Sequence, residues 1–470
     1  MNGQRTHLIV VEEERRLQQA AANHPELLQR LGVISQTEIE AQLGLTALPA
    51  DVPTGYLRYR LEDFIVEELD ANGRVITVDP GPVWSGSPSN QQTVYADMVK
   101  AGLDTFEALE RVAEALHIPF DGLSYAGLKD ARAITAQRIA IKGTTPEAIL
   151  RATINDVFLK GATLSRGKLY RGQLAGNRFT LTIRTATPPT EEIFQPAITR
   201  LQKGFYNYYG TQRFGRRLLS HHFGRLLCRG NFQQAVEEYF TATHPVVRQY
   251  EGLIRTQTGQ LLGQWAAIKE LMGHYPYTFA FDIKMLEYLI DNPGDWIGAL
   301  TTISEQVKLW VYAYMSWLIN QTLSTYETEG IQPPQLLPIP LSITDRDREP
   351  YRDLLADDNV PFDFPKHLTA LPFLEMPTRT LETVIHPVIH AWACTPVGLV
   401  ISFDLPTGAY ATTALRQLMI LDVEEPAPSW VPNGIIDPKK ILGLGTIEPL
   451  RHIFGSALEP RSTTTPLAQE

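Results

Sequence analysis

The chain has 470 residues, of which 44% are hydrophobic and 20% charged, which excludes a globally disordered protein and predicts two or three domains. Its formal net charge is −10, and its two cysteines, Cys228 and Cys394, exclude a disulfide framework and a cysteine-based zinc site. Without a long apolar run or a signal peptide, the sequence predicts a soluble cytoplasmic protein that does not enter membranes.

Helical and strand patterns begin early in the chain. Residues 12–30 are rich in Glu, Gln, Ala and Leu and are interrupted by Pro25, so a broken helical extension is expected. Alternation predicts a strand over 56–69. Asp104 or Thr105 can cap a helix that places Phe106 and the apolar residues after it on one face.

The rest of the chain alternates between strand signals and helix signals. A loop over 125–132 leads into a strand over 135–142, and Pro146 begins a further helix. Two more strands are predicted at 179–184 and 399–403, with helices at 232–241 and 305–325 between them. Strands at both ends of the chain and helices in the middle predict an α+β sheet domain interrupted by an inserted domain.

Positive charge is concentrated in one segment. Between residues 157 and 237 the chain carries 13 Lys or Arg against 3 Glu, interleaved with Tyr and Phe, although the chain as a whole is acidic. Cations hold phosphates and aromatic rings stack on bases, so the pattern favours RNA, with a solvated basic surface as the alternative. The residues expected to contact RNA are Lys168, Arg171, Arg213, Arg216 and Arg217.

Asp130 is the strongest candidate for a catalytic residue. It lies in a glycine-containing loop directly before a predicted strand, between Lys129 and Arg132. Neighbouring cations favour an ionised carboxylate, which can attack carbon or remove a proton. An aspartate that only caps a turn produces the same local pattern.

Five motifs occur in the order in which one enzyme family has them. Residues 125–137, YAGLKDARAITAQ, resemble the catalytic loop of the TruD family of tRNA pseudouridine synthases. Four further segments are similar to motifs of that family: 63–68 (DFIVEE), 176–179 (GNRF), 207–215 (NYYGTQRFG) and 405–412 (LPTGAYAT). The resemblance extends from about Tyr56 to Met419.

The resemblance implies a fold and an activity. The fold is a pseudouridine synthase-type catalytic domain, with a mixed, mainly antiparallel sheet of permuted strand order, interrupted by a mostly helical α+β domain. The activity is isomerisation of a uridine, usually uridine 13 of tRNA. The expected partner is tRNA, and since no protein partner is implied, a monomer is expected. Isomerisation transfers no electrons, so no metal and no organic cofactor are expected. The expected boundaries are 1–50 (helical extension), 51–215 (catalytic domain, first part), 216–375 (inserted domain), 376–425 (catalytic domain, second part) and 426–470 (C-terminal extension with a disordered end).

The resemblance also implies roles for individual residues. Asp130 becomes the essential aspartate, and Arg58 pairs with it where the family usually has lysine. Lys129, which is next to Asp130 in the sequence, is the alternative partner. The carboxylate either attacks covalently or removes the C2′ proton to give a glycal, and the sequence leaves both open. The expected substrate-binding residues are Tyr125, Gln137, Asn177, Phe179 and Arg379. Core packing of Phe179 and turn capping by Asn177 are the alternatives for these two residues.

Two positions depart from the family pattern. Ala131 replaces the usual basic residue after the Lys-Asp pair, and Tyr206 replaces a common proline. Neither residue belongs to the expected chemistry, so these departures concern RNA contacts.

Two other functions are compatible with the sequence. A non-catalytic RNA-binding protein could keep the same scaffold. A magnesium-dependent phosphatase would place Asp345 and Asp347 after a strand, although Pro338 argues against a central strand there. His386 and His390 have the spacing of zinc ligands on a helix, but the intervening proline favours a strand with ordinary histidines.

Overall fold

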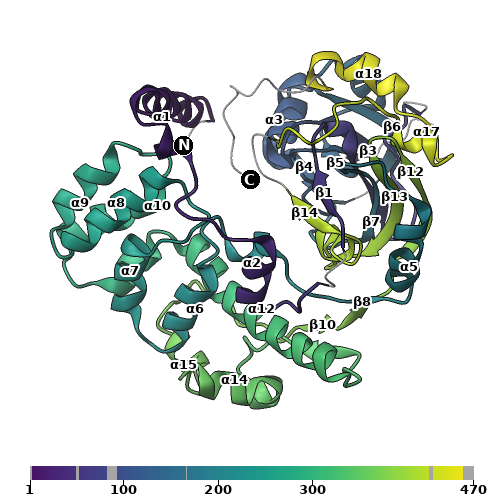
Figure 1. Cartoon of the computed structure of the whole chain (residues 1–470). Coiled ribbons are helices and arrows are strands. Elements are labelled where there is room, and N and C mark those ends of the chain that lie inside the picture. The colour runs from purple at the N-terminus through teal and green to yellow at the C-terminus, as the bar shows by residue number, and fades with distance from the viewer. Residues whose placement is uncertain (1–2, 49–51, 82–92, 166, 423–426, 459–470) are drawn as a thin grey trace. The chain divides into compact units, whose positions relative to one another are not determined.

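The structure, a computed structural model, describes residues 3–48, 52–81, 93–165, 167–422 and 427–458 (Figure 1). The chain divides into two compact units. The helical unit comprises the described residues up to Ala47 and Tyr206–Thr383, and the sheet unit comprises those of Leu48–Phe205 and those from Val384 onward. Among these residues, no helix combines the length and apolarity needed to cross a bilayer.

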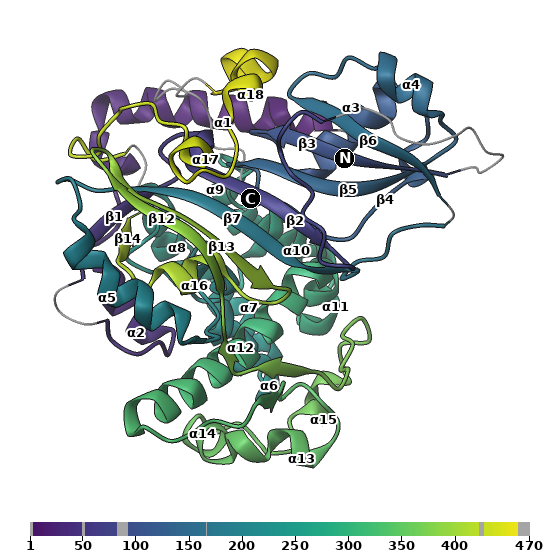
Figure 2. The ribbon, with the colours of Figure 1, turned by 90° about the vertical axis from the view of Figure 1, so that its right-hand side faces the viewer.

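A mixed sheet of ten strands organises the sheet unit (Figure 2). Its main path runs β12–β13–β7–β2–β5–β3–β6, while β1 pairs with β7 and β14, and β4 pairs with β5. The pairs β2–β5 and β1–β14 are parallel and the others antiparallel. The strands are β1 (Thr54–Leu57), β2 (Phe64–Asp70), β3 (Thr93–Ala101), β4 (Leu123–Tyr125), β5 (Ile134–Lys142), β6 (Val157–Ser165), β7 (Leu174–Arg184), β12 (Val388–Thr395), β13 (Gly398–Pro406) and β14 (Ile420–Asp422).

Strand β7 joins two distant stretches of the chain. It pairs with β13 from Gly398, opposite Arg184, to Pro406, opposite Gly176. A Cβ at Gly176 would lie 2.0 Å from the carbonyl oxygen of Leu405, so this close approach requires glycine. The segments before and after the helical unit therefore complete one sheet.

Helices cover both faces of this sheet. On one face, α5 (Glu191–Gln202) and α16 (Ala411–Leu415) cover an apolar core on β2, β7 and β13, and α3 (Thr105–Ala115) covers a second core on β3 and β5. On the opposite face, α18 (Glu448–Phe454) packs against β2, β3 and β5. The unit also contains α4 (Pro146–Arg151) and α17 (Pro438–Ile441).

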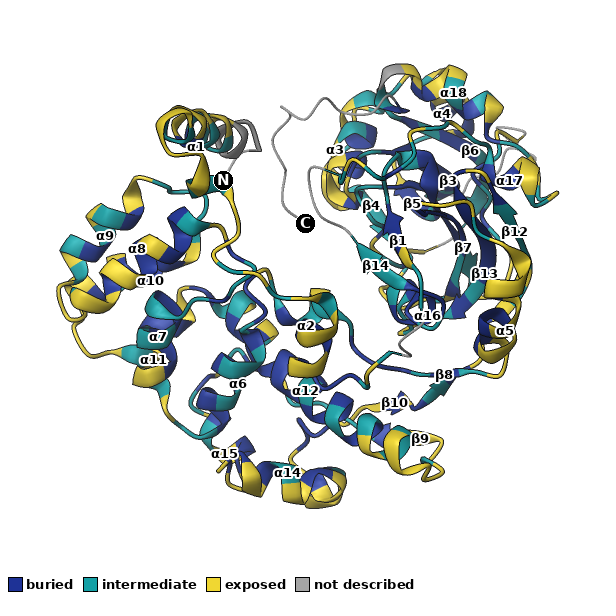
Figure 3. Cartoon of the chain, viewed as in Figure 1, coloured by how far each residue is buried: buried dark blue, intermediate teal, exposed yellow. Residues whose placement is uncertain are grey.

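The helical unit is built around α12 (Ser304–Glu329). Helix α6 (Ser220–Cys228) packs closely against it, because Gly224 has no Cβ, which would lie 2.1 Å from the carbonyl oxygen of Trp310. Figure 3 shows that the surrounding helices carry both buried and exposed residues, whereas α12 has no exposed residue between Trp310 and Ser324. The other elements are α1 (Gly3–Asn23), α2 (Gln36–Gln42), α7 (Phe232–Thr241), α8 (Gln249–Gln260), α9 (Trp265–Gly273), α10 (Ala280–Asp291), α11 (Trp296–Thr301), α13 (Asp345–Arg348), α14 (Arg352–Asp357), α15 (Pro365–Leu368), β9 (Leu336–Pro338) and β10 (Thr380–Glu382).

Several elements predicted from the sequence are confirmed. Asp104 caps α3 by accepting a hydrogen bond from the backbone N–H of Glu107. Pro146 begins α4 as predicted, and the structure adds a cap by Thr145, which accepts from the backbone N–H of Ala148. The strands predicted at 135–142, 179–184 and 399–403 correspond to β5, β7 and β13. The coarse fold class, α+β with a large, mostly antiparallel sheet and a helical region, is confirmed.

Two expectations about these elements are wrong. The single strand predicted over 56–69 is two strands, because a 3-10 turn at Leu61–Asp63 separates β1 from β2. Phe106 is exposed rather than on the buried face of α3. The argument from Pro338 against a central strand before Asp345 agrees with the structure, where this segment forms only the three-residue strand β9 of a separate two-stranded sheet.

The expected domain boundaries stay a prediction. The residues up to Ala47 cluster with the helical unit, and described residues after 426 cluster with the sheet unit. The end expected to be disordered, 459–470, lies outside the described residues.

Candidate active site

A strip of polar side chains crosses one face of the sheet, between the two apolar cores on that face. Asn177 on β7 is paired with Glu68 on β2, and Thr135 on β5 is paired with Lys100 on β3. Because side chains alternate along strands, these four residues and Gln137 share one face. Buried polar groups need partners, and the loop over 126–132 supplies several of them.

Asp130 and Arg58 form the centre of the candidate site. A guanidinium nitrogen of Arg58, Nη2, lies 2.8 Å from Oδ1 of Asp130, and the aspartate side chain is 31% exposed. Arg58 has a left-handed backbone, with φ +66°, which is rare for a residue with a side chain. In the described part of the chain, Oδ2 of Asp130 makes no hydrogen bond, so one carboxylate oxygen is anchored and the other is available. The expected pairing of Arg58 with Asp130 is confirmed.

Aromatic rings connect this ion pair to β7. The Arg58 guanidinium lies 4.2 Å from the centre of the Phe64 ring, and Phe64 packs edge-on against Phe179 with 6.2 Å between ring centres. Phe179 also stacks on Phe403 of β13 at 5.6 Å. Phe179 is thus part of the core, and its exposed fraction is 7%.

Lys129 does not pair with Asp130. Its Nζ lies 2.8 Å from Oε2 of Glu68, and both side chains are almost completely buried. The other oxygen of Glu68 accepts a hydrogen bond from the backbone N–H of Arg138. The expectation that Lys129 is an alternative partner of Asp130 is therefore wrong, because its charge is used to attach the loop to β2.

Two further groups hold the same loop. Nε2 of Gln137 donates to the carbonyl oxygen of Gly127 at 3.0 Å, and Oγ1 of Thr105 accepts from the backbone N–H of Lys129 at 2.8 Å. Gln137 is fully buried, which makes it a support of the loop. Its Oε1 and the Oδ1 of Asn177 are buried and have no hydrogen-bond partner in the described part of the chain.

Sequence reasoning missed Lys100. It is fully buried, and its Nζ donates to the carbonyl oxygens of Leu103, Asp130 and Lys129 at 2.6, 2.7 and 3.4 Å. A signal existed in the sequence, because Lys100 continues the alternation of the buried residues Ala96 and Met98 along β3.

Tyr125 lies beside a residue expected to bind RNA. A guanidinium nitrogen of Arg171 donates to its hydroxyl at 3.0 Å, and the Phe106 ring packs edge-on against it. Tyr125 and Arg171 are thus adjacent in the sheet unit.

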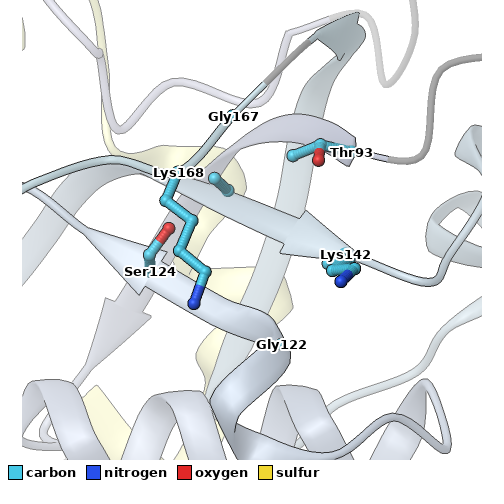
Figure 4. Close-up of a pocket in the computed structure, with 7 residues that line it drawn as sticks. Thr93, Gly122, Ser124, Lys142, Gly167 and Lys168 are labelled. Carbon is cyan, nitrogen blue, oxygen red and sulfur yellow. The ribbon is translucent and has the colours of Figure 1, made fainter.

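A cavity of about 220 Å³ lies at the ends of β3, β4 and β5 (Figure 4). Lys142 and Lys168 line it together with the hydroxyl-bearing residues Thr93 and Ser124. Both lysines are exposed and have no carboxylate partner among the described residues. The cavity therefore presents positive charge and hydroxyl groups to solvent.

The remaining predicted residues lie in the helical unit. Arg379 is exposed there, and its carbonyl oxygen accepts from the backbone N–H of Ile339. Arg216 pairs with Glu251. Arg217 is buried, its guanidinium lies over the Tyr239 ring, and burial lowers its pKa to about 10. Arg217 is therefore not accessible to a phosphate, in contrast to the expectation for it. The segment expected to bind RNA is divided between the two units.

The residues considered for a phosphatase site and for a zinc site make other contacts in the structure. Asp345 begins the four-residue helix α13 and pairs with the buried Arg348. His390 lies on β12, where it contacts Asp404 at 2.9 Å. No group of three possible metal ligands occurs in the described ranges.

Comparison with known proteins identifies the family. The family model for tRNA pseudouridine synthase D (TruD) matches residues 46–338. A "Probable tRNA pseudouridine synthase D" of Methanopyrus kandleri is 29% identical over 67% of this chain and 82% of the relative. A "tRNA pseudouridine synthase D" of Geobacter sp. is 28% identical over 59% of this chain and 66% of the relative. The chain therefore belongs to the TruD family of tRNA pseudouridine synthases, which are isomerases.

A solved structure supports the same fold. The TruD structure from Methanosarcina mazei superposes with a TM-score of 0.65 over 82% of this chain and 98% of that chain, at 23% identity. The resemblance found from the five sequence motifs is confirmed.

Proposed function

We propose that the sheet unit converts a uridine of tRNA, uridine 13 by family resemblance, into pseudouridine in the cytoplasm, with Asp130 as the catalytic carboxylate and a sheet of the permuted pseudouridine synthase type. The observation that carries the proposal is the ion pair of Asp130 with Arg58. This pair leaves Oδ2 without a partner in the described part of the chain.

The reaction needs one free carboxylate oxygen. The bond from C1′ to N1 breaks, a bond from C1′ to C5 forms, and the proton lost from C5 is balanced by one gained at N1. Oδ2 of Asp130 can attack the nucleoside or take the C2′ proton, and Arg58 holds Oδ1 in either case. No electron acceptor is needed.

The detached uracil must be held while it turns. Asn177 lies in the polar strip, and its buried Oδ1 has no partner in the described chain. Such an acceptor is costly to bury alone, and a uracil N–H would satisfy it. The stacked rings of Phe179 and Phe403 give this part of the face an apolar wall.

The phosphates of the tRNA need exposed cations in the sheet unit. Lys142 and Lys168 have no carboxylate partner in the described chain, and Arg171 lies next to Tyr125. These groups are better candidates than Arg217, because they are exposed.

The test uses Asp130→Asn, which keeps the size of the side chain and removes its charge. Unmodified tRNA is incubated with each protein, and pseudouridine is mapped by carbodiimide treatment and primer extension. The variant should form no product and bind tRNA within about twofold of the wild type. Asp156→Asn is the matched control, because Asp156 pairs with Arg111 at 2.9 Å with a similar exposure, and its activity should be unchanged.

Product formed by Asp130→Asn at more than a trace would contradict the assignment. Tight tRNA binding by a wild-type protein that forms no product would favour the non-catalytic alternative. Activity should persist in excess EDTA on tRNA that stays folded in monovalent salt, whereas a magnesium-dependent phosphatase would lose its activity.

A further inference from the structure

Lys100 is a buried cation bound by backbone carbonyls. It has no carboxylate partner within the described residues, and its Nζ donates to the carbonyl oxygens of Leu103, Lys129 and Asp130. An ammonium group has three N–H donors, so these three acceptors use all of them. Burying a charge is costly unless it is fully hydrogen-bonded. The buried ammonium group of Lys100 therefore calls for a function that needs its charge.

We propose that Lys100 is a positioning residue of the active site, which fixes the backbone of Asp130 and thereby the direction of its carboxylate. The inference rests on the proposed function, because it has a consequence for the reaction only if Asp130 reacts. Arg58 holds the same residue by its side chain, so the aspartate is fixed from both ends. Misplacement of a reacting group by about 1 Å can slow a reaction by about a hundredfold.

The proton on Lys100 is held weakly for a lysine. Burial lowers its pKa to about 8. The charged groups that act on it are Asp130, Asp104 and Glu107, which oppose the shift, and Lys129, which adds to it. The neighbouring strands place only uncharged residues opposite it, Thr135 on β5 and Val157 on β6.

A pH dependence follows from this geometry. A neutral amine has two N–H donors and a lone pair, so it cannot satisfy three carbonyl oxygens. The hold on Asp130 should therefore weaken as the pH rises through about 8, and the rate of isomerisation should fall by up to tenfold per pH unit above it.

The test measures single-turnover formation of pseudouridine at saturating enzyme between pH 6.5 and 9.5. Lys100→Met should be at least tenfold slower at pH 7, bind tRNA within twofold of the wild type, and lack the decline above pH 8. Lys100→Arg keeps its charge at every pH, so it should be slower and also lack the decline. If ionisation of the uracil, and not of Lys100, caused the fall in rate above pH 8, the same fall would occur in Lys100→Arg.

Lys439→Met is the matched control. Lys439 is also a buried lysine of the sheet unit, and its Nζ contacts Glu67 and Asp79 on the opposite face of the sheet. This variant should be less stable but keep the wild-type rate per bound tRNA and the decline above pH 8. An equal loss of rate in both variants would mean that general destabilisation is the cause, and would overturn the positioning role.

The remaining outcomes also decide the matter. If Lys100→Met does not fold, the other two proteins still test the inference. It is overturned if the wild-type rate stays constant up to pH 9.5, or if the rate of Lys100→Arg still declines above pH 8. Product from Asp130→Asn would contradict the proposed function. An inactive Asp130→Asn beside a Lys100→Met with wild-type rate and pH profile would overturn only the role of Lys100.

Discussion

Breaking the ion pair between Glu68 and Lys129 should destabilise the sheet unit strongly. The two side chains are 1% and 2% exposed, and their charged atoms are 2.8 Å apart. Lys129→Met leaves the carboxylate of Glu68 buried without a cation. The pair also connects β2 to the loop that carries Asp130, so the loop should become mobile in this variant.

The expected magnitude follows from the distance. Two charges 2.8 Å apart attract by about 6 kcal/mol at an effective dielectric constant of about 20. Desolvation offsets part of this attraction, and removal of one partner of a buried pair costs about 3–5 kcal/mol. Lys129→Met combined with Glu68→Met should cost only about 1 kcal/mol, mainly from the lost hydrogen bond to the N–H of Arg138.

Hydrogen exchange of the β2 and β5 amides is the appropriate measurement, because a chain of two units need not unfold in one step. Lys308→Met is the control, since Lys308 forms an exposed pair with Glu305 and its loss should cost less than about 1 kcal/mol. A cost below about 1 kcal/mol for Lys129→Met, or a double variant as unstable as the sum of the two single variants, would refute this reasoning.

Three further predictions concern activity, tRNA binding and pH. Arg58→Ala should lower the rate by about 10–100-fold, because Oδ1 of Asp130 loses its anchor, whereas Arg111→Ala should leave the rate unchanged. Changing Lys142 and Lys168 together to Glu should weaken tRNA binding and lower the slope of log affinity against log salt by about 1.4, and an unchanged slope would place the docking face elsewhere. Burial lowers the pKa of His221 to about 3, so the helical unit should lose stability as the pH falls below about 6.5, where the unfolded chain gains a proton; His221→Phe should remove this loss in denaturation curves measured between pH 7 and 5.

The sequence was sufficient to predict helix ends that are fixed by residues close together in the chain. Asp104 and Thr145 cap helices through backbone groups three residues away, so the sequence window contains both partners. The turn between β1 and β2 has both local and distant partners. Asp63 accepts a hydrogen bond from the backbone N–H of Arg60, and it also forms a two-pronged ion pair with Arg184, which is 121 residues away and lies outside any local sequence window.

The candidate site shows the same division. The motif around Asp130 was predictable because its residues are consecutive, and the pairing with Arg58 was expected from the family pattern. The partner of Lys129 was not predictable, because Glu68 approaches it only when β2 pairs with β5. Arg217 was misjudged because charge in a sequence does not reveal burial.

The pairing of β7 with β13 has a consequence for the order of events during synthesis. All residues of the loop with Asp130 leave the ribosome long before β13 does, and until then one edge of β7 has no partner strand in this sheet. At usual elongation rates the interval between the synthesis of β7 and that of β13 is roughly 10–45 s. During that time an apolar edge strand carrying Phe179 is open to other chains, which is a known route to aggregation. A nascent chain that lacks β13 also lacks Phe403, the ring that stacks on Phe179, so this part of the apolar core is completed only when that strand is made.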